Sequence, residues 1–381
     1  MFLDHTELVP GFASGQLAMF LFFGLSGFLI TALLAAERAA WGRIGIRGFY
    51  LRRALRLLPA LVVFLVAWLM VVAVFGRAGW MTTAPNGHSG TGQAFTVALE
   101  GAGAALGYLT NWFELFHVFT GYVAVGHLWS LAVEEQFYLL WAPALVLLLA
   151  RGRRTALAGA AVLAAASFAD VALIQQAQST TSWVFRSTDT RAGAFLAGAA
   201  LAVWWSGRPA PSAPRGRLRN CAAWAALAVM AWSGWVFAHH VSFLTYNVSW
   251  IAVSVAAPVL TVALVDRAAK TPRSLFPGQV MTYLGRRSYG LYLWHYVWLT
   301  WLRDLGLPGI ALALAASLAS AELSWRLVEA RALSYKHRFA PVGGRPAGPG
   351  TTVLASQPSI TDPTRRVRKM VAHGTGRRIT R

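Results

Sequence analysis

The chain has 381 residues, of which 56% are hydrophobic and only 13% are charged. Soluble globular proteins carry about 25% charged residues, so this composition excludes an ordinary soluble domain. Several apolar runs of about 20 residues have the length needed to cross the hydrocarbon core of a bilayer. The sequence therefore predicts an all-α protein, a polytopic bundle of membrane helices.

The net charge of +20 raises nucleic acid as a partner, but the positions of the charges favour a membrane. All but five of the 34 lysines and arginines lie in the segments 37–58, 151–154, 208–219, 266–287 and 331–381. Basic residues concentrate in cytoplasmic loops. This pattern predicts a multi-pass membrane protein with a cytoplasmic C-terminus, and it leaves nucleic acid the weaker alternative.

Nine membrane spans are predicted, at 17–36, 57–76, 129–150, 155–174, 191–206, 221–239, 243–265, 288–302 and 308–328. Residues 77–127 are predicted to be an external segment that lies at the interface, because the basic residues flanking the second and third spans leave an even number of crossings between them. With a cytoplasmic C-terminus, nine spans put residue 1 outside. The count therefore predicts one more helix before Met1.

Residues 336–381 are rich in Gly, Pro, Ser, Thr and Arg, and we expect them to form a basic, disordered cytoplasmic tail behind a membrane domain at 1–335. The single cysteine, Cys221, begins an apolar run and allows no disulfide within the chain. We expect it to serve packing.

Two stretches near the N-terminus combine apolar length with unusual residues. LFFGLSGFLIT at 21–31 has Ser26 and Gly27 in its middle, and small residues favour close helix packing in membranes. FYLRRALRLLP at 49–59 places Arg52, Arg53 and Arg56 just before a membrane entry. Such a cluster either binds phosphate groups through planar guanidinium groups or simply anchors the helix.

The stretch HLWSLAVEEQFYLLW at 127–141 places two glutamates inside an apolar helix. A carboxylate at the bilayer centre costs about 2.5–3.5 kcal/mol on insertion scales. Helical periodicity puts Ser130, Glu134 and Tyr138 on one face and Glu135 about 100° away. One carboxylate is therefore expected to line a polar cavity while the other pairs with an arginine of a neighbouring helix. The alternative is a structural ion pair at the outer interface.

A fourth stretch, LGRRSYGLYLWHYVW at 284–298, carries aromatic residues well into a predicted span. His295 lies about one turn deeper than Tyr292, below the level at which aromatic belts normally lie. A binding role and a structural hydrogen bond are both open for this histidine.

In this order, the four stretches resemble the motifs of the acyltransferase-3 family of bacterial integral membrane acyltransferases. The family segments GVDLFFVLSGFLIT, FYxRRxxRxxP, HTWSLxxEEQFYLL and SYGLYLWH correspond here to 18–31, 49–59, 127–140 and 288–295. Lesser matches are YLTNW at 108–112, TDTRAGAFLAG at 188–198 and SWRLVE at 324–329. The resemblance implies ten helices, one more than the nine counted here, and covers the chain from about His5 to Ser334.

The resemblance further implies an O-acyltransferase of the bacterial inner membrane, which moves an acyl group from cytoplasmic acyl-CoA to a hydroxyl of a carbohydrate, a glycolipid or a macrolide-like metabolite. Neutral histidine is a suitable base for such a hydroxyl. The site residues that we expect are His5, Glu134 and Glu135 as catalytic residues, Arg52, Arg53 and Arg56 as the acyl-CoA site, and Ser26, Trp129, Ser130, Tyr138, Arg191, Tyr292 and His295 as substrate-binding residues. No metal and no tightly bound cofactor are expected, with acyl-CoA as a co-substrate.

The chain departs from the family pattern at acidic positions. Ala18-Met19-Phe20 replaces GVD, so the aspartate is lost, and Gly193 replaces the aspartate of the usual RxD that begins at Arg191. These losses leave a second function open, a transporter or flippase that moves an acylated glycolipid without chemistry. A non-catalytic scaffold for a polysaccharide synthase is a third possibility.

Overall fold

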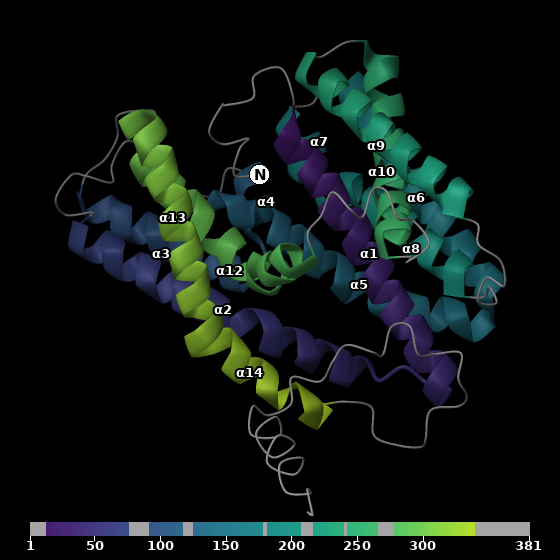
Figure 1. Cartoon of the computed structure of the whole chain (residues 1–381), viewed down its shortest axis with the longest axis horizontal. Helices are drawn as coiled ribbons and strands as arrows, with labels where there is room; N and C mark the ends of the chain where they lie inside the picture. The colour runs from purple at the N-terminus through teal and green to yellow at the C-terminus, as the bar shows by residue number, and fades with distance from the viewer. Residues whose placement is uncertain are drawn as a thin grey trace, which may run out of the picture. The chain divides into compact units, whose positions relative to one another are not determined.

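The computed structural model describes residues 13–75, 91–116, 125–177, 181–206, 216–239, 242–265 and 278–339, and every element in these ranges is helical (Figure 1). The long helices are α1 (Ser14–Trp41), α2 (Ile46–Phe75), α5 (Trp129–Arg151), α6 (Arg153–Gln176), α8 (Thr188–Ser206), α9 (Gly216–His239), α10 (Phe243–Val265), α12 (Gly278–Leu302) and α13 (Gly306–Ser324). Each of the nine predicted spans thus falls on a helix. The fold class is confirmed.

Shorter elements connect the long helices. They are α3 (Thr91–Leu106), α4 (Thr110–Leu115), η3 (Gly126–Leu128), α7 (Thr181–Arg186), η4 (Arg303–Leu305), the π-helix η5 (Trp325–Glu329), α14 (Ala330–Ser334) and η6 (Tyr335–Phe339). The predicted boundary of the tail at residue 336 falls inside η6, which packs against α2. Residues 340–381 lie outside the described ranges, as do residues 1–12 with His5.

Seven segments of the described residues are long and apolar enough to cross a membrane. The seventh, Gly278–Ser334, is 57 residues long and contains two predicted spans, which η4 separates at Arg303–Leu305. Helix α8 is not among the seven, and its first turn carries Asp189 and Arg191. Within the predicted external segment, α3 is an apolar helix too short to count as a span, and it packs against α2.

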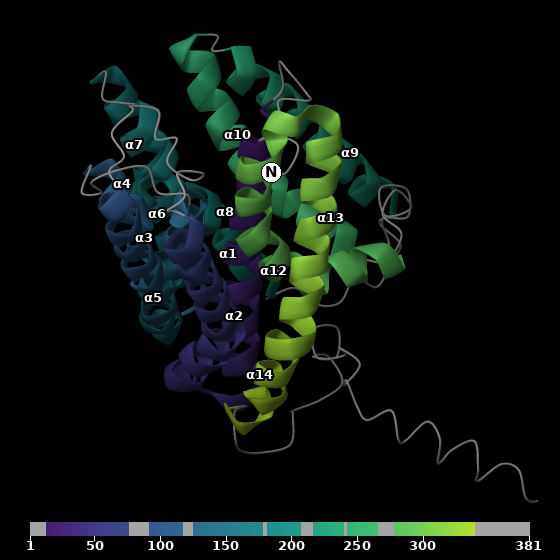
Figure 2. The ribbon, with the colours of Figure 1, turned by 90° about the vertical axis from the view of Figure 1, so that its left-hand side faces the viewer.

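Two groups of helices meet at α5. One hydrophobic core joins α1, α6, α8, α9 and α10 to residues of α5 such as Val133 and Phe137. The other joins α2, α3 and α12 to Leu128 and Leu131. Figure 1 shows these groups on either side of α5, and Figure 2 shows α13 running beside α12. The start of α5, where the paired glutamates lie, is therefore the seam of the bundle.

Glycines bring α1 and α8 into backbone contact. A Cβ added at Gly27 would lie 1.9 Å from the carbonyl oxygen of Phe195, and one at Gly198 would lie 2.1 Å from the carbonyl oxygen of Gly24. No side chain fits in this space, so the close packing predicted for 21–31 is confirmed. It places Ser26 against α5.

Candidate active site

The two glutamates of α5 share one arginine of α2. The Nη2 of Arg53 donates to Oε1 of Glu135 and its Nε to Oε2 at 3.4 Å, and Nη2 also lies 3.7 Å from Oε1 of Glu134. The Arg53 guanidinium stacks 3.7 Å from the centre of the Tyr138 ring. The three charged side chains are only 9–14% exposed. The expectation that an arginine of a neighbouring helix pairs with a glutamate is therefore met, and the partner is Arg53.

Two hydroxyl groups converge on Glu134. The Tyr138 hydroxyl donates to its Oε1 at 2.6 Å and the Ser26 hydroxyl donates to the same atom at 3.0 Å. Both side chains are buried. Ser26, which composition alone assigns to packing, thus belongs to the same polar cluster as Arg53. We call Ser26, Arg53, Glu134, Glu135 and Tyr138 the glutamate cluster.

A second polar cluster lies where α12 meets the start of α5. The Tyr292 hydroxyl contacts the Ser130 hydroxyl at 2.9 Å and donates to the His127 carbonyl at 2.6 Å. Nδ1 of His295 lies 2.7 Å from the Tyr292 carbonyl, and its ring centre is 5.5 Å from that of His127. The structure therefore joins three predicted residues, Ser130, Tyr292 and His295, with His127. We call these four residues the His127–Tyr292 cluster. The prediction omitted His127, although it begins the quoted stretch 127–141.

Gln136, the residue after the glutamates, fastens the short helix α4 and the first residue of α8 to α5. Its Nε2 donates to the Tyr108 carbonyl at 2.6 Å and to the Asn111 side chain at 3.0 Å, and its Oε1 accepts from Trp112 at 3.0 Å. The Thr188 hydroxyl donates to the same Oε1 at 2.5 Å. The lesser motifs YLTNW and TDTR thus meet at one side chain that the prediction left out.

An ion pair on α4 and α7 lies beside this network. Nη1 of Arg186 lies 2.9 Å from Oε2 of Glu114. Burial raises the pKa of Glu114 to about 7, although Arg186 opposes the shift. Gly126 leaves space for the carboxylate, because a Cβ there would lie 2.5 Å from its Oε1. Glu114 is thus a carboxyl group outside the predicted spans that titrates near neutral pH.

Among the described residues, the other arginines of the FYLRRALRLLP stretch form no ion pair with Glu134 or Glu135. Arg52 pairs with Glu37 at 3.2 Å and donates to the Phe339 carbonyl at 2.6 Å, which holds η6 on α2. Arg56 is exposed and has no ion pair or hydrogen bond with another described residue. Desolvation and the charges of Arg56 and Arg52 hold the pKa of Lys336 below its ordinary value. Three cations thus gather where η6 meets α2.

Arg191 of α8 is fully buried among aromatic rings. Its guanidinium carbon lies 4.4–5.7 Å from the ring centres of Phe20, Trp129, Phe185 and Trp250. Its Nε donates to the Phe185 carbonyl at 2.7 Å. This arrangement brings together the predicted residues Arg191 and Trp129, and it includes Phe20, at the position where the resemblance leads us to expect an aspartate.

Gly193, the other departure from an aspartate, lies against α6. A Cβ there would lie 2.4 Å from the Phe168 ring, so the packing of α6 on α8 excludes a larger residue without movement of Phe168. Ser167 accepts the Gly193 N–H at 2.8 Å. Of the described residues, no three His, Cys, Asp or Glu side chains gather as metal ligands. His5 lies outside the described residues, so its role as a base stays a prediction.

Comparison with known families agrees with these motifs. The family model described as "Acyltransferase domain" matches residues 2–327. The chain belongs to this acyltransferase family. The match includes the glutamate cluster, Arg191 and the His127–Tyr292 cluster, and it ends before η6.

Curated relatives are bacterial proteins with related names. The chain is 30% identical over 336 residues to a Bacillus subtilis protein named "Putative peptidoglycan O-acetyltransferase YrhL", with 83% of this chain and 50% of that protein covered. It is 29% identical over 333 residues to the peptidoglycan O-acetyltransferase OatA of Listeria monocytogenes, with 83% of this chain and 51% of OatA covered. The chain thus spans about half the length of the curated relatives it matches. No solved structure matches it.

Proposed function

We propose that the chain is an integral membrane O-acyltransferase that moves an acyl group from acyl-CoA to a hydroxyl of a sugar, a glycolipid or a secondary metabolite. The observation that carries the proposal is the glutamate cluster, which joins the family's EE and RxxR motifs inside a bundle of membrane helices. The names of the curated relatives support O-acetyl transfer to a carbohydrate of the cell envelope.

In the proposed reaction the acceptor hydroxyl attacks the thioester carbonyl. The new C–O bond forms as the C–S bond breaks, the base takes the hydroxyl proton, and the CoA thiolate leaves and is protonated. His5 remains the proposed base, since neutral histidine accepts a proton near pH 7. Glu134 and Glu135 are the other proposed catalytic residues. Arg53 donates to Glu135, and the hydroxyls of Ser26 and Tyr138 donate to Glu134, so both carboxylates are held in fixed positions.

The donor site is proposed at the junction of η6 and α2. Because Arg53 faces two carboxylates, a phosphate beside it would meet a cluster that formally carries one excess negative charge. Arg56 and Lys336 are exposed, and Arg52, although it is paired with Glu37, lies close enough to act on Lys336 as a charge. Guanidinium groups bind phosphates bidentately, and an ammonium group binds them as a point charge. We therefore assign the CoA phosphates to these three side chains.

Two variants of η6 test the donor site. Lys336→Met removes a proposed phosphate ligand, whereas Arg338 lies over the Tyr335 ring at 4.9 Å, so Arg338→Met removes a cation of the same segment without that role. We expect Lys336→Met to weaken CoA binding to the purified protein about tenfold and Arg338→Met to leave it within about twofold. Equal losses would mean that general positive charge attracts CoA. No binding by the wild type would refute acyl-CoA as donor.

Mass spectrometry of envelope glycans, glycolipids and secreted metabolites tests the activity. A strain lacking the gene is compared with strains that carry the wild type, Glu135→Gln or Arg326→Met, the last a control because Arg326 is 73% exposed. We expect one acylated species to disappear in the deletion and with Glu135→Gln, and to return with Arg326→Met. An unchanged set of acylated species with a glycolipid on the other side of the membrane would favour the flippase.

A further inference from the structure

Arg191 is a cation whose hydrogen bonds the described structure does not complete. Nε is bonded to a carbonyl, but Nη1 and Nη2 are buried and have no hydrogen-bond partner. The side chain is 0% exposed. Burial of a charged group that lacks partners is strongly unfavourable. Those two groups carry four N–H donors, which is the arrangement that binds a carboxylate or a phosphate.

The aromatic rings do not replace the missing acceptors. Phe185 and Trp250 lie nearest, with ring centres 4.4 and 4.6 Å from the guanidinium carbon. Cation–π contact satisfies the flat faces of a guanidinium group. The N–H donors point outward in its plane and still require oxygen atoms. The rings therefore keep water away from Arg191 without accepting hydrogen bonds from its Nη1 and Nη2 groups.

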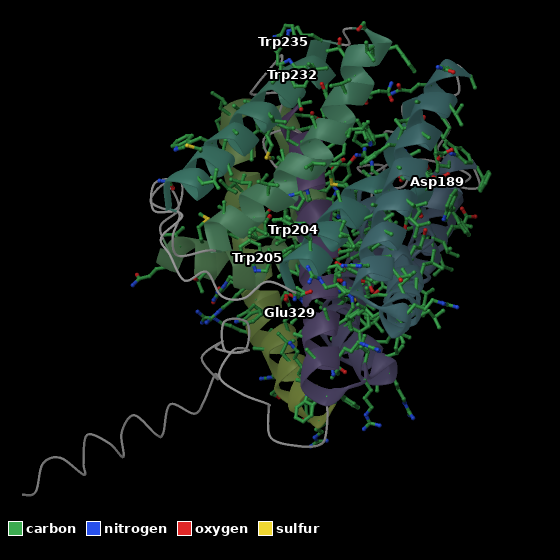
Figure 3. All side chains as sticks on the ribbon, turned by 90° about the vertical axis from the view of Figure 1, so that its right-hand side faces the viewer. Asp189, Trp204, Trp205, Trp232, Trp235 and Glu329 are labelled. Atoms are coloured by element: carbon green, nitrogen blue, oxygen red, sulfur yellow. The ribbon has the colours of Figure 1, made fainter. Side chains whose placement is uncertain are left out.

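The acidic residues near Arg191 in sequence do not neutralise it. Asp189, on the same helix, is exposed and accepts the backbone N–H of Thr190 at 2.9 Å, and Figure 3 shows it at the edge of the molecule. No ion pair joins Arg191 to an acid among the described residues. One of the two aspartates expected from the family pattern is Phe20 here, whose ring centre lies 5.3 Å from the Arg191 guanidinium carbon. A neutral residue at this position leaves the positive charge available to a ligand.

From this geometry we infer that Arg191 binds an anionic oxygen group, a carboxylate or a phosphate, on the acceptor molecule. The inference rests on the proposed function only in assigning that group to the acceptor. Trp129 lies against Arg191 and directly precedes Ser130 of the His127–Tyr292 cluster. An acceptor held by Arg191 is therefore close to the start of α5. The chain thus selects acceptors that carry a negative charge.

Phe185 is the ring around Arg191 that lies on a short helix. Three of the four rings lie on the long helices α1, α5 and α10, whereas Phe185 belongs to α7, which has six residues. α7 is held to α4 by the hydrogen bond from Asn111 to the Arg186 carbonyl at 3.3 Å and by the ion pair of Arg186 with Glu114. A displacement of this short helix would remove the Phe185 ring from Arg191 and leave the other three rings in place.

Binding of two anionic amphiphiles tests the inference and separates the two chemistries. Laurate and dodecyl phosphate are titrated into the full chain in a neutral detergent, with dodecanol as the uncharged reference, and bound complexes are counted by native mass spectrometry. We expect one anion to bind at 1:1 at least about tenfold more tightly than dodecanol, and the preferred head group names the class. Absence of any preference would overturn the inference.

The variants keep the test sharp. Arg191→Gln removes the charge, and Phe20→Asp supplies a carboxylate beside it, so each is expected to abolish the preference. Phe20→Leu and Arg303→Gln are expected to retain it within about threefold, because the first adds no charge and the second removes an exposed arginine elsewhere. Retention of anion preference in Phe20→Asp would overturn the inference, even if Arg191→Gln fails to fold. If the wild type prefers anions but transfers no acyl group, the proposed function is refuted and the binding of an anion by Arg191 is not.

Discussion

Replacing Arg53 by methionine removes the partner of two buried carboxylates. The side chains of Arg53, Glu134 and Glu135 are 14%, 9% and 14% exposed, so the pair belongs with buried rather than surface ion pairs. Removal of one partner from a buried pair costs about 3–5 kcal/mol, because the remaining charge stays without compensation. We expect Arg53→Met to lower the free energy of unfolding by that amount. The double variant Arg53→Met/Glu135→Gln should recover a large part of it.

Unfolding in mixed micelles of neutral detergent and dodecyl sulfate is followed by circular dichroism. It gives the free energies of unfolding of the wild type, Arg53→Met and the double variant. Arg326→Met is the control. Arg326 is exposed, so its ion pair with Glu322 should contribute less than about 1 kcal/mol to the free energy of unfolding. A loss below about 1 kcal/mol for Arg53→Met would refute the reasoning. So would a double variant that is no more stable than the single one. Either result would mean that Arg53 does not compensate the carboxylates.

Three further predictions concern other parts of the fold. Folding raises the pKa of Glu114 from 4.5 to about 7 through burial, so the folded state binds its proton more tightly. Thermal stability should therefore fall as the pH rises from about 4.5 to about 7, by up to roughly 3 kcal/mol, and Glu114→Gln should remove this dependence. Gly198→Ala places a Cβ 2.1 Å from a backbone oxygen of α1 and should cost about 1–3 kcal/mol in detergent unfolding, whereas Gly285→Ala meets nothing within 4 Å and should cost nothing. Tyr292→Phe removes the hydroxyl that contacts Ser130, so acyl transfer should fall about tenfold while the melting temperature stays nearly unchanged.

The sequence predicts the long helices well because eight of the nine lie in apolar segments of membrane length, which hydropathy alone identifies, α8 being the exception. It also predicts the close packing of α1, since small residues such as Ser26 and Gly27 favour close contact between membrane helices. The pairing of Glu135 follows from the cost of a buried charge. Which arginine pairs with it does not follow, since Arg53 is 82 residues away in the chain and Arg52 and Arg56 are equally basic.

The surroundings of Arg191 could not be predicted, because they combine side chains from four helices. The sequence predicts Trp129 at the site, but Phe20 and Trp250 resemble ordinary apolar residues of a membrane helix. Only the arrival of α8 at the same place makes them neighbours of a cation. The packing of η6 on α2 is unpredictable for a related reason. It includes a hydrogen bond from Arg52 to a backbone carbonyl, which any residue at position 339 supplies.

The position of the charges along α5 follows from the two cores that this helix joins. Leu139, Leu140 and Leu147 are 61–68% exposed on the outside of the bundle, where the surface is apolar. Glu134 is turned the other way, toward α1 and α2, and is buried. A carboxylate at the leucine positions would meet lipid without a partner, at the full cost of a charge in hydrocarbon. At the seam the same group meets an arginine and two hydroxyls, so a membrane helix can carry two adjacent glutamates there without exposing either to lipid.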